Sequence, residues 1–201
     1  APAPHQFGTA LKNITVDVRE GEVLGIGGVA GNGQDELVAA LSGEMKTAAG
    51  MVVIDGREIG RLGPNERRAA GLCAAPEERN GHAAAPDMSL TENALMTGAV
   101  RKNLVKNGLL DWPAAKAFAE EVIKAFDVRT PSANTQAQKL SGGNQQKVVV
   151  ARELSREVKL LIVSQPTRGV DVGSIEFIHE RIVAERDEGK AVLLISTELD
   201  E

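Results

Sequence analysis

Two short runs of wholly apolar residues constrain the fold of this 201-residue chain most strongly. Leu160–Val163 and Ala191–Ile195 contain no polar residue, which is typical of strands buried on both faces of a parallel sheet. Between them, Ile175, Ile178 and Ile182 recur at the spacing of one helix face. Because strand, helix and strand follow one another, the sequence predicts an α/β domain around a mainly parallel sheet.

The same patterns predict further elements. Val23–Ile26 is an apolar run bounded by glycine and predicts another buried strand, and Met51–Ile54 predicts a strand that enters a tight turn. Ile14–Val18 alternates apolar and polar residues, as a half-buried strand does. Helical spacing predominates over residues 90–126, whereas prolines and a glycine within residues 72–89 indicate mostly loop.

Composition excludes several classes of protein. The net charge of −5 argues against a nucleic-acid binder. Cys73 is the only cysteine, which rules out an internal disulfide framework and a cysteine-rich zinc site. The longest apolar runs are much shorter than a membrane span. The sequence also lacks the pattern of a secretory signal, in which a charged segment precedes an apolar one.

A glycine-rich loop joins the predicted strand at Val23–Ile26 to a predicted helix, which is the context of a phosphate-binding loop. Four residues separate Gly28 from Gly33, as in the pattern G-x-x-x-x-G-K-[ST]. Such a loop aims backbone N–H groups and a helix N-terminus at an anion. The predicted nucleotide-binding residues of this loop are Gly28, Gly31, Asn32, Gly33, Gln34 and Asp35.

The last two positions of the loop depart from the pattern. Gln34 replaces the lysine and Asp35 replaces the serine or threonine. One lost charge pair at about 4 Å corresponds to about 4 kcal/mol at an effective dielectric near 20, before desolvation is counted. A nucleotide would therefore be held by backbone N–H groups and opposed by Asp35, unless that carboxylate binds Mg²⁺ directly. A plain glycine-rich turn is the alternative.

Two further motifs resemble those of ATP-binding cassette (ABC) ATPases. Leu140–Lys147 reads LSGGNQQK and resembles the LSGGQ signature, and Leu160–Asp171 resembles the Walker B strand with its D-loop. With the glycine loop, three motifs stand in the family's order and cover nearly the whole chain. The resemblance implies a P-loop NTPase fold with a mainly parallel sheet, a small antiparallel β portion and a helical subdomain.

The resemblance also implies a domain organisation. Residues 1–201 are expected to form a single nucleotide-binding domain, truncated at its C-terminus because the sequence stops just after a predicted strand. Residues 1–85 and 136–201 are expected to form the α/β core with the β portion. Residues 86–135 resemble the helical subdomain that docks onto the membrane subunit, although helical spacing alone fits a core-packing helical pair equally well.

The exact residues of the motifs indicate which branch of the family the chain resembles. LSGGNQQK, PTRGVDVG, GVAGNGQ and PEER together resemble importers of simple sugars and nucleosides, whose ATPase subunit carries two cassettes in one polypeptide. A degenerate loop like this one is typical of the second cassette. The implied partners are the first cassette, transmembrane permease subunits and, indirectly, a substrate-binding lipoprotein, with no nucleic acid. The implied cofactor is ATP, with Mg²⁺ weak or absent at this loop, and the implied location is the cytoplasmic face of the bacterial cell membrane.

The signature is expected to contact the ATP that is bound by the partner cassette. Serine and glycines at a helix N-terminus present O–H and N–H donors to an anion. By resemblance, Ser141, Gly142, Gly143 and Asn144 are the nucleotide-binding residues here. A simple serine N-cap uses the same donors, so both interpretations stand.

The Walker B end departs from the family pattern. Ser164 replaces the aspartate that orders Mg²⁺, and Gln165 replaces the glutamate at the general-base position. Because an amide does not accept the proton of the attacking water, general-base catalysis is lost there. We therefore predict no metal ligand in this chain and a site that does not hydrolyse ATP.

Four positions carry looser family roles. Glu77 stands at the Q-loop glutamine, although a solvated charged turn explains it nearly as well. Phe7 stands where an aromatic residue stacks on adenine, or is a packing residue at the start of the chain. Asp171 belongs to the D-loop that contacts the other cassette, and Thr197 stands at the switch-histidine position.

Two other functions stay open. One is a non-hydrolysing pseudo-ATPase with a regulatory or structural role. The other is a soluble, non-transport ABC ATPase, of the kind that acts in DNA repair or translation, although the acidic charge and the LSGGNQQK wording argue against it.

Overall fold

A computed structural model describes residues 8–79, 81–99, 103–154 and 158–198. The chain forms two compact units. The first takes in 1–74, 158–165 and 182–201, and the second takes in 75–157 and 166–181.

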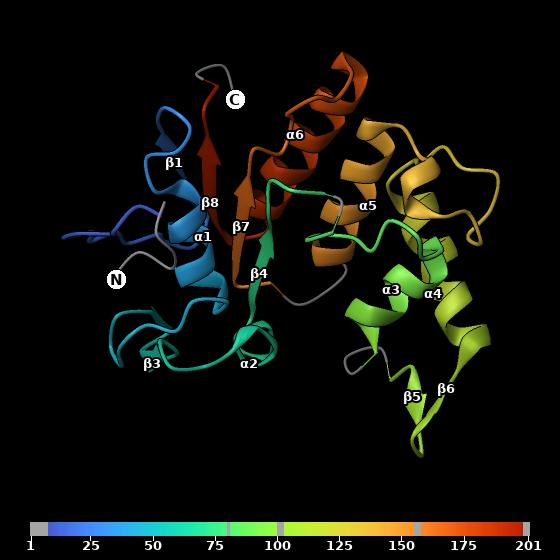
Figure 1. The fold of residues 1–201 in the computed structure, drawn as a ribbon, viewed down its shortest axis with the longest axis horizontal. Helices are drawn as coiled ribbons and strands as arrows, with labels where there is room; N and C mark the ends of the chain where they lie inside the picture. The colour runs from blue at the N-terminus through green and yellow to red at the C-terminus, as the bar shows by residue number, and fades with distance from the viewer. Residues whose placement is uncertain (1–7, 80, 100–102, 155–157, 199–201) are drawn as a thin grey trace. The chain divides into compact units, whose positions relative to one another are not determined.

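The first unit is built on a four-stranded sheet (Figure 1). Its strands are β1 (Val23–Gly27), β8 (Ala191–Ser196), β7 (Leu160–Ser164) and β4 (Leu72–Ala75), side by side in that order. Both β1 and β7 pair with β8 in parallel, with Gly27 opposite Ser196. The predicted parallel sheet is confirmed.

The core of this unit packs against the sheet. Ile162 and Ile195 are fully buried, as the apolar runs of β7 and β8 predict. Helix α1 (Gln34–Ser42) adds Val38 to the same cluster. The helix ends at Gly43, whose φ of 91° lies in the left-handed region that suits glycine at a helix C-terminus.

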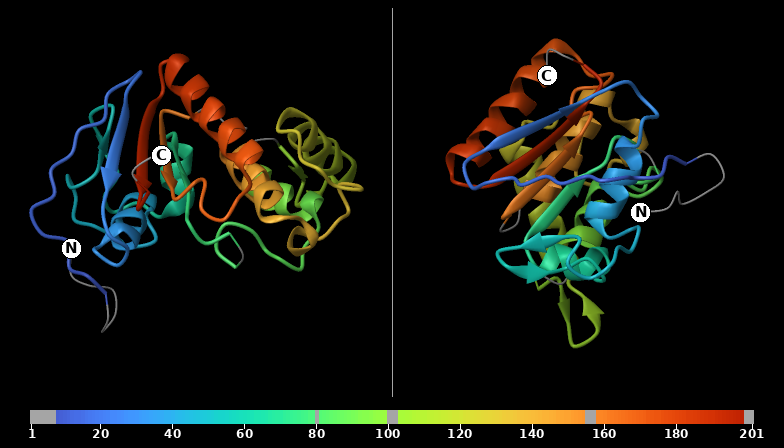
Figure 2. Two further views of the ribbon diagram at one scale, coloured as in Figure 1. Left: turned by 90° about the horizontal axis from the view of Figure 1, so that it is seen from above. Right: turned by 90° about the vertical axis from the view of Figure 1, so that its left-hand side faces the viewer.

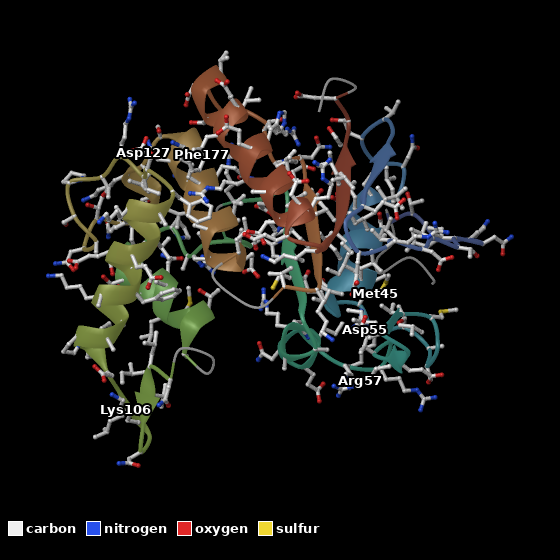
Figure 3. All side chains as sticks on the ribbon, turned by 180° about the vertical axis from the view of Figure 1, so that it is seen from behind. Met45, Asp55, Arg57, Lys106, Asp127 and Phe177 are labelled. Atoms are coloured by element: carbon white, nitrogen blue, oxygen red, sulfur yellow. The ribbon has the colours of Figure 1, made fainter. Side chains whose placement is uncertain are left out.

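Small elements complete the first unit. Strands β2 (Val53–Ile54) and β3 (Arg57–Glu58) form an antiparallel pair, so the strand predicted over Met51–Ile54 begins two residues later. The turn between them, Asp55–Gly56, has positive φ at both residues, as a type I′ hairpin turn requires. Figure 3 labels Asp55 and Arg57 at this hairpin.

Helix α2 (Pro64–Ala69) carries a fully buried arginine, Arg67. Its guanidinium donates to four backbone carbonyls at distances of 2.5 to 3.0 Å. The acceptors are the carbonyls of Ala40, Leu41, Gly60 and Leu62. Since the first two belong to the last turn of α1, Arg67 satisfies carbonyls that the helix leaves unpaired.

The second unit is mainly helical (Figure 2). Helix α3 (Leu90–Gly98) begins with a capping box between Ser89 and Glu92, and α4 (Trp112–Ala125) has a proline in its first turn. The 3₁₀ helix η1 (Ala137–Lys139) precedes α5 (Gly142–Leu154).

The antiparallel pair β5 (Val105–Lys106) and β6 (Leu109–Leu110) joins α3 to α4. Figure 3 labels Lys106 on this hairpin. The last helix, α6 (Val172–Asp187), begins in the second unit and ends in the first. None of the helices in the described ranges has both the length and the apolar character needed to cross a bilayer.

One prediction about local structure is wrong. Residues Ile14–Val18 form no strand, and Ile14 and Val16 are 49% and 44% exposed. Alternation produces a strand only where a neighbouring strand supplies hydrogen bonds, and none of the described strands pairs with this segment. The prediction of mostly loop over residues 72–89 holds after Ala75: Leu72–Ala75 forms the buried strand β4, and the described residues of 76–89 contain no helix or strand.

Candidate functional site

The glycine loop joins β1 to α1, as the sequence predicts. Gly31 and Gly33 have φ of 85° and 104°, which only glycine adopts without strain. The N–H of Gly28 donates to the carbonyl of Ser196 at 3.2 Å, so the loop starts at the carboxyl end of β8. The loop therefore has the strand–turn–helix geometry of a phosphate-binding loop.

The side chain of Gln34 folds back across this loop. Its Oε1 accepts from the N–H of Asn32 at 3.0 Å, and its Nε2 donates to the carbonyl of Val29 at 2.9 Å. A Cβ on Gly28 would lie 2.9 Å from the same Nε2. The Gln34 carboxamide thus occupies one of the backbone donors that the loop would offer to an anion.

The segment before the loop also lies against it. The N–H of Thr9 donates to a carboxylate oxygen of Glu36 at 2.7 Å, and its hydroxyl donates to the carbonyl of Gly31 at 3.2 Å. A Cβ on Gly33 would lie 3.3 Å from a methyl of Leu11. Figure 2 shows this segment passing beside α1.

The first turn of α1 carries two carboxylates, on Asp35 and Glu36. Asp35 is exposed, and carboxylates at a helix N-terminus interact favourably with its positive dipole end. Within the described residues, no group of three or more His, Cys, Asp or Glu side chains is arranged to hold a metal ion.

At the end of β7, Gln165, predicted at the general-base position, contacts Thr197, predicted at the switch-histidine position. Gln165 is 4% exposed and has a φ of 50°, and its Oε1 accepts from the N–H and the hydroxyl of Thr197 at 3.2 and 3.1 Å. The hydroxyl of Ser164 is buried and has no hydrogen-bond partner in the part of the chain that the structure describes. Neither Gln165 nor Thr197 carries a group that takes a proton from water at neutral pH.

The signature forms the start of α5. The Ser141 hydroxyl accepts from the side-chain NH₂ group of Asn144 at 2.8 Å, and the side-chain Oδ1 of Asn144 accepts from the N–H of Arg129 at 2.7 Å. A Cβ on Gly143 would lie 2.5 Å from the hydroxyl of Ser174 and 2.6 Å from a carboxylate oxygen of Asp171. Only glycine allows the signature to approach α6 this closely.

The structure defines the contacts of Glu77 and Asp171, which carry looser family roles. The Glu77 carboxylate forms an ion pair with Arg168. Asp171 accepts from the hydroxyl and the N–H of Ser174 at 2.9 and 3.1 Å, and the bond from that hydroxyl holds the pKa of the Asp171 carboxyl below its usual range. Phe7 lies outside the described residues.

The structure therefore brings the predicted residues together in two sets. Within the first unit, the glycine loop meets β8, whose end carries Thr197, the partner of Gln165. Within the second unit, the signature meets Asp171. The sequence alone did not identify Thr9, Arg79 or Arg168 as residues that contact these loops. The two arginines lie in the charged segments PEER and PTRG, which were the only indication of them in the sequence.

Comparison with known proteins decides the family. A family model described as ABC transporter matches residues 11–168. The chain belongs to the ABC transporter family. Membership implies the use of ATP with Mg²⁺, and the predicted P-loop ABC ATPase fold is confirmed.

Several ABC relatives from prokaryotes are similar over most of this chain. It is 42% identical to the guanosine import ATP-binding protein NupO of Bacillus subtilis over 95% of its length, and 43% identical to the nucleoside import ATP-binding protein NupA of Lactococcus lactis over 95%. It is 44% identical to the glucose import ATP-binding protein TsgD13 of Haloferax volcanii over 96%. The chain spans only 38%, 38% and 35% of these relatives.

Solved ABC cassettes share the fold. The dimeric cassette MJ0796, bound to ADP and phosphate, superposes with a TM-score of 0.75 at 24% identity, covering 94% of this chain and 81% of that one. An "ATP binding subunit of ABC transporter" superposes with a TM-score of 0.73 at 18% identity, over 98% of this chain and 77% of that one. At these identities the likeness establishes the fold alone.

Proposed function

We propose that this chain is a degenerate cassette of an ABC importer for nucleosides or simple sugars, the second of two cassettes in one polypeptide. Its signature, Ser141–Asn144, contacts the ATP that is bound by the first cassette. The names of the similar relatives support the import of nucleosides or sugars, and the chain's coverage of little more than a third of their length fits one cassette of a two-cassette subunit.

The observation that carries the proposal is the contact between Gln165 and Thr197. Gln165, at the general-base position, accepts hydrogen bonds from the hydroxyl and the N–H of Thr197, at the switch position, at 3.1 and 3.2 Å. Neither side chain is a base. A water molecule placed here would find no group to take its proton. The proposal therefore assigns this half a binding role and assigns hydrolysis to the other half.

The residues present fit a weak nucleotide site better than a Mg²⁺–ATP site. The loop supplies backbone N–H donors and a helix N-terminus, which suit a phosphate. The lysine is absent, Gln34 holds the N–H of Asn32, and the carboxylate of Asp35 repels an anion. Ser164 provides a neutral hydroxyl where a carboxylate would bind the metal. We therefore propose weak or absent Mg²⁺ at this loop.

The proposed partners follow from the same assignment. They are the first cassette, transmembrane permease subunits and, through these, a substrate-binding lipoprotein, at the cytoplasmic face of the cell membrane. Residues 86–135 are the proposed helical subdomain that docks onto the permease, within a single cassette over 1–201. Exposed apolar side chains there support docking: Leu109, Leu110 and Trp112 are 74%, 46% and 48% exposed.

A non-hydrolysing pseudo-ATPase with a regulatory role is a second candidate, favoured by the Gln34 contacts. Steady-state ATP hydrolysis by the 201-residue chain tests both proposals. We expect no hydrolysis above the buffer rate, and no change in Gln165→Ala. Hydrolysis that Gln165→Ala abolishes would contradict the assignment, because it would make this a working site.

A further inference from the structure

Three charged side chains of the second unit connect two loops that are far apart in sequence. Glu77 and Arg79 lie on the segment after β4, and Arg168 lies on the segment before α6. The carboxylate of Glu77 pairs with the guanidinium of Arg168, and these side chains are 27% and 63% exposed. An ion pair this exposed adds little to the stability of the fold, so its expected effect is on the positions of the two segments.

Arg79 lies between two glycine backbones. Its Nη1 donates to the carbonyl of Gly142 at 3.3 Å, and a Cβ on Gly142 would lie 3.4 Å from the same nitrogen. A Cβ on Gly169, whose φ is 64°, would lie 3.4 Å from Nη2. The two backbones themselves are close, since a Cβ on Gly142 would lie 2.9 Å from the carbonyl oxygen of Gly169.

The bond to Gly142 has a direct consequence for the signature. The carbonyl of Gly142 and the N–H of Gly143 belong to one planar peptide unit and point in opposite directions. A guanidinium that binds the carbonyl therefore orients the N–H, and its positive charge polarises the peptide so that the N–H donates more strongly. This N–H is in the first turn of α5, where it has no acceptor within the helix.

We propose that Glu77, Arg79 and Arg168 form a clamp that positions the signature for its phosphate contact. The Glu77–Arg168 pair holds the PEER segment against the segment Thr167–Asp171, and Arg79 then reaches Gly142. Asp171 and Ser174 also lie close to Gly143, since a Cβ there would be 2.6 and 2.5 Å from their side-chain oxygens. Arg79 is thus a positioning residue, and this role rests on the proposed function of the signature.

The test uses the complete ATPase polypeptide with its permease, in which kcat and KM for ATP are measured. We expect Arg79→Ala to lower kcat about tenfold or more, because small misplacements of positioning groups cost up to about a hundredfold. The KM for ATP and the unfolding temperature should change little. Arg79→Lys, which still donates to a carbonyl, should recover part of kcat, and Arg61→Ala, at an exposed arginine outside the clamp, should leave it unchanged.

A charge exchange tests the ion pair. Glu77→Arg and Arg168→Glu should each lower kcat, and the double variant should recover most of it. The clamp is overturned if Arg79→Ala keeps full kcat, if its loss follows a matching fall in unfolding temperature, or if the exchange recovers nothing.

The variant Ser141→Arg separates this inference from the proposed function. It places a bulky cation in the phosphate contact and should abolish hydrolysis. If it does so while the clamp variants are fully active, only the clamp is wrong. If Ser141→Arg itself hydrolyses ATP normally, the proposed function fails and the clamp fails with it.

Discussion

Replacing Gln34 with alanine should strengthen nucleotide binding by this chain. In the structure the Gln34 carboxamide accepts from the N–H of Asn32 at 3.0 Å and donates to the carbonyl of Val29 at 2.9 Å. A phosphate that binds this N–H must first break the bond to Gln34. The side chain is therefore a competitor of the phosphate, although its position in the motif is that of a phosphate ligand.

The magnitude follows from a single hydrogen bond. A net hydrogen bond in water contributes about 0.5–1.5 kcal/mol, so its removal should lower the Kd for ATP by about two- to tenfold. Gln34→Lys removes the same bond and adds a positive charge, so the Kd should fall further. Solvent reduces the Coulomb gain because the loop is exposed.

Calorimetric titration of the 201-residue chain with ATP and Mg²⁺ measures these constants. Gln138→Ala is the matched control, since it removes an exposed carboxamide that donates to Asp87 at 2.8 Å in the second unit. It should leave the Kd unchanged. An unchanged or higher Kd in Gln34→Ala would refute the reasoning, because the carboxamide would then be neutral or a ligand.

Three further predictions concern positions outside the loop. Arg67→Met should lower the free energy of unfolding by roughly 3–5 kcal/mol, measured by urea denaturation, because it leaves buried carbonyls without a donor; a loss below about 1 kcal/mol would contradict this. Gly143→Ala should cost about 1–3 kcal/mol because its Cβ would lie 2.5 Å from a hydroxyl, whereas Gly25→Ala, with no atom within 4 Å, is the control and should cost less. Ser174→Ala should raise the pKa of Asp171 toward its usual value, followed by NMR titration, since the Ser174 hydroxyl lowers that pKa. Because the pKa of Asp171 is lowered in the folded state, its carboxylate stabilises the fold at pH values above the ordinary pKa of the group. This stabilisation is lost as the pH falls through the lowered pKa. Ser174→Ala should therefore lose less stability in acid than the unmodified chain does.

The strands of the sheet were predictable where burial alone decides the structure. Leu160–Val163 and Ala191–Ile195 are apolar throughout and became β7 and β8, because such segments are stable only between packed layers. Ile14–Val18 alternates equally well yet forms no strand, since pairing depends on a neighbour that the local pattern does not report. The two-residue strands β5 and β6 are too short to show any period.

The site was predictable as motifs and not as contacts. The replaced residues Gln34 and Gln165 were evident from the sequence, but their hydrogen bonds depend on backbone turns, including the positive φ of Gln165. The bond between Arg79 and Gly142 joins residues 63 apart, and no spacing rule connects them. Long-range contacts of this kind follow from the fold.

The proposed function assigns this cassette a signature and no hydrolytic site. The decisive measurement is ATP hydrolysis by the complete polypeptide, compared between Gln165→Ala and Ser141→Arg. We expect Gln165→Ala to keep the rate of the unmodified protein and Ser141→Arg to abolish hydrolysis. Loss of hydrolysis in Gln165→Ala together with normal hydrolysis in Ser141→Arg would show instead that this cassette holds the working hydrolytic site.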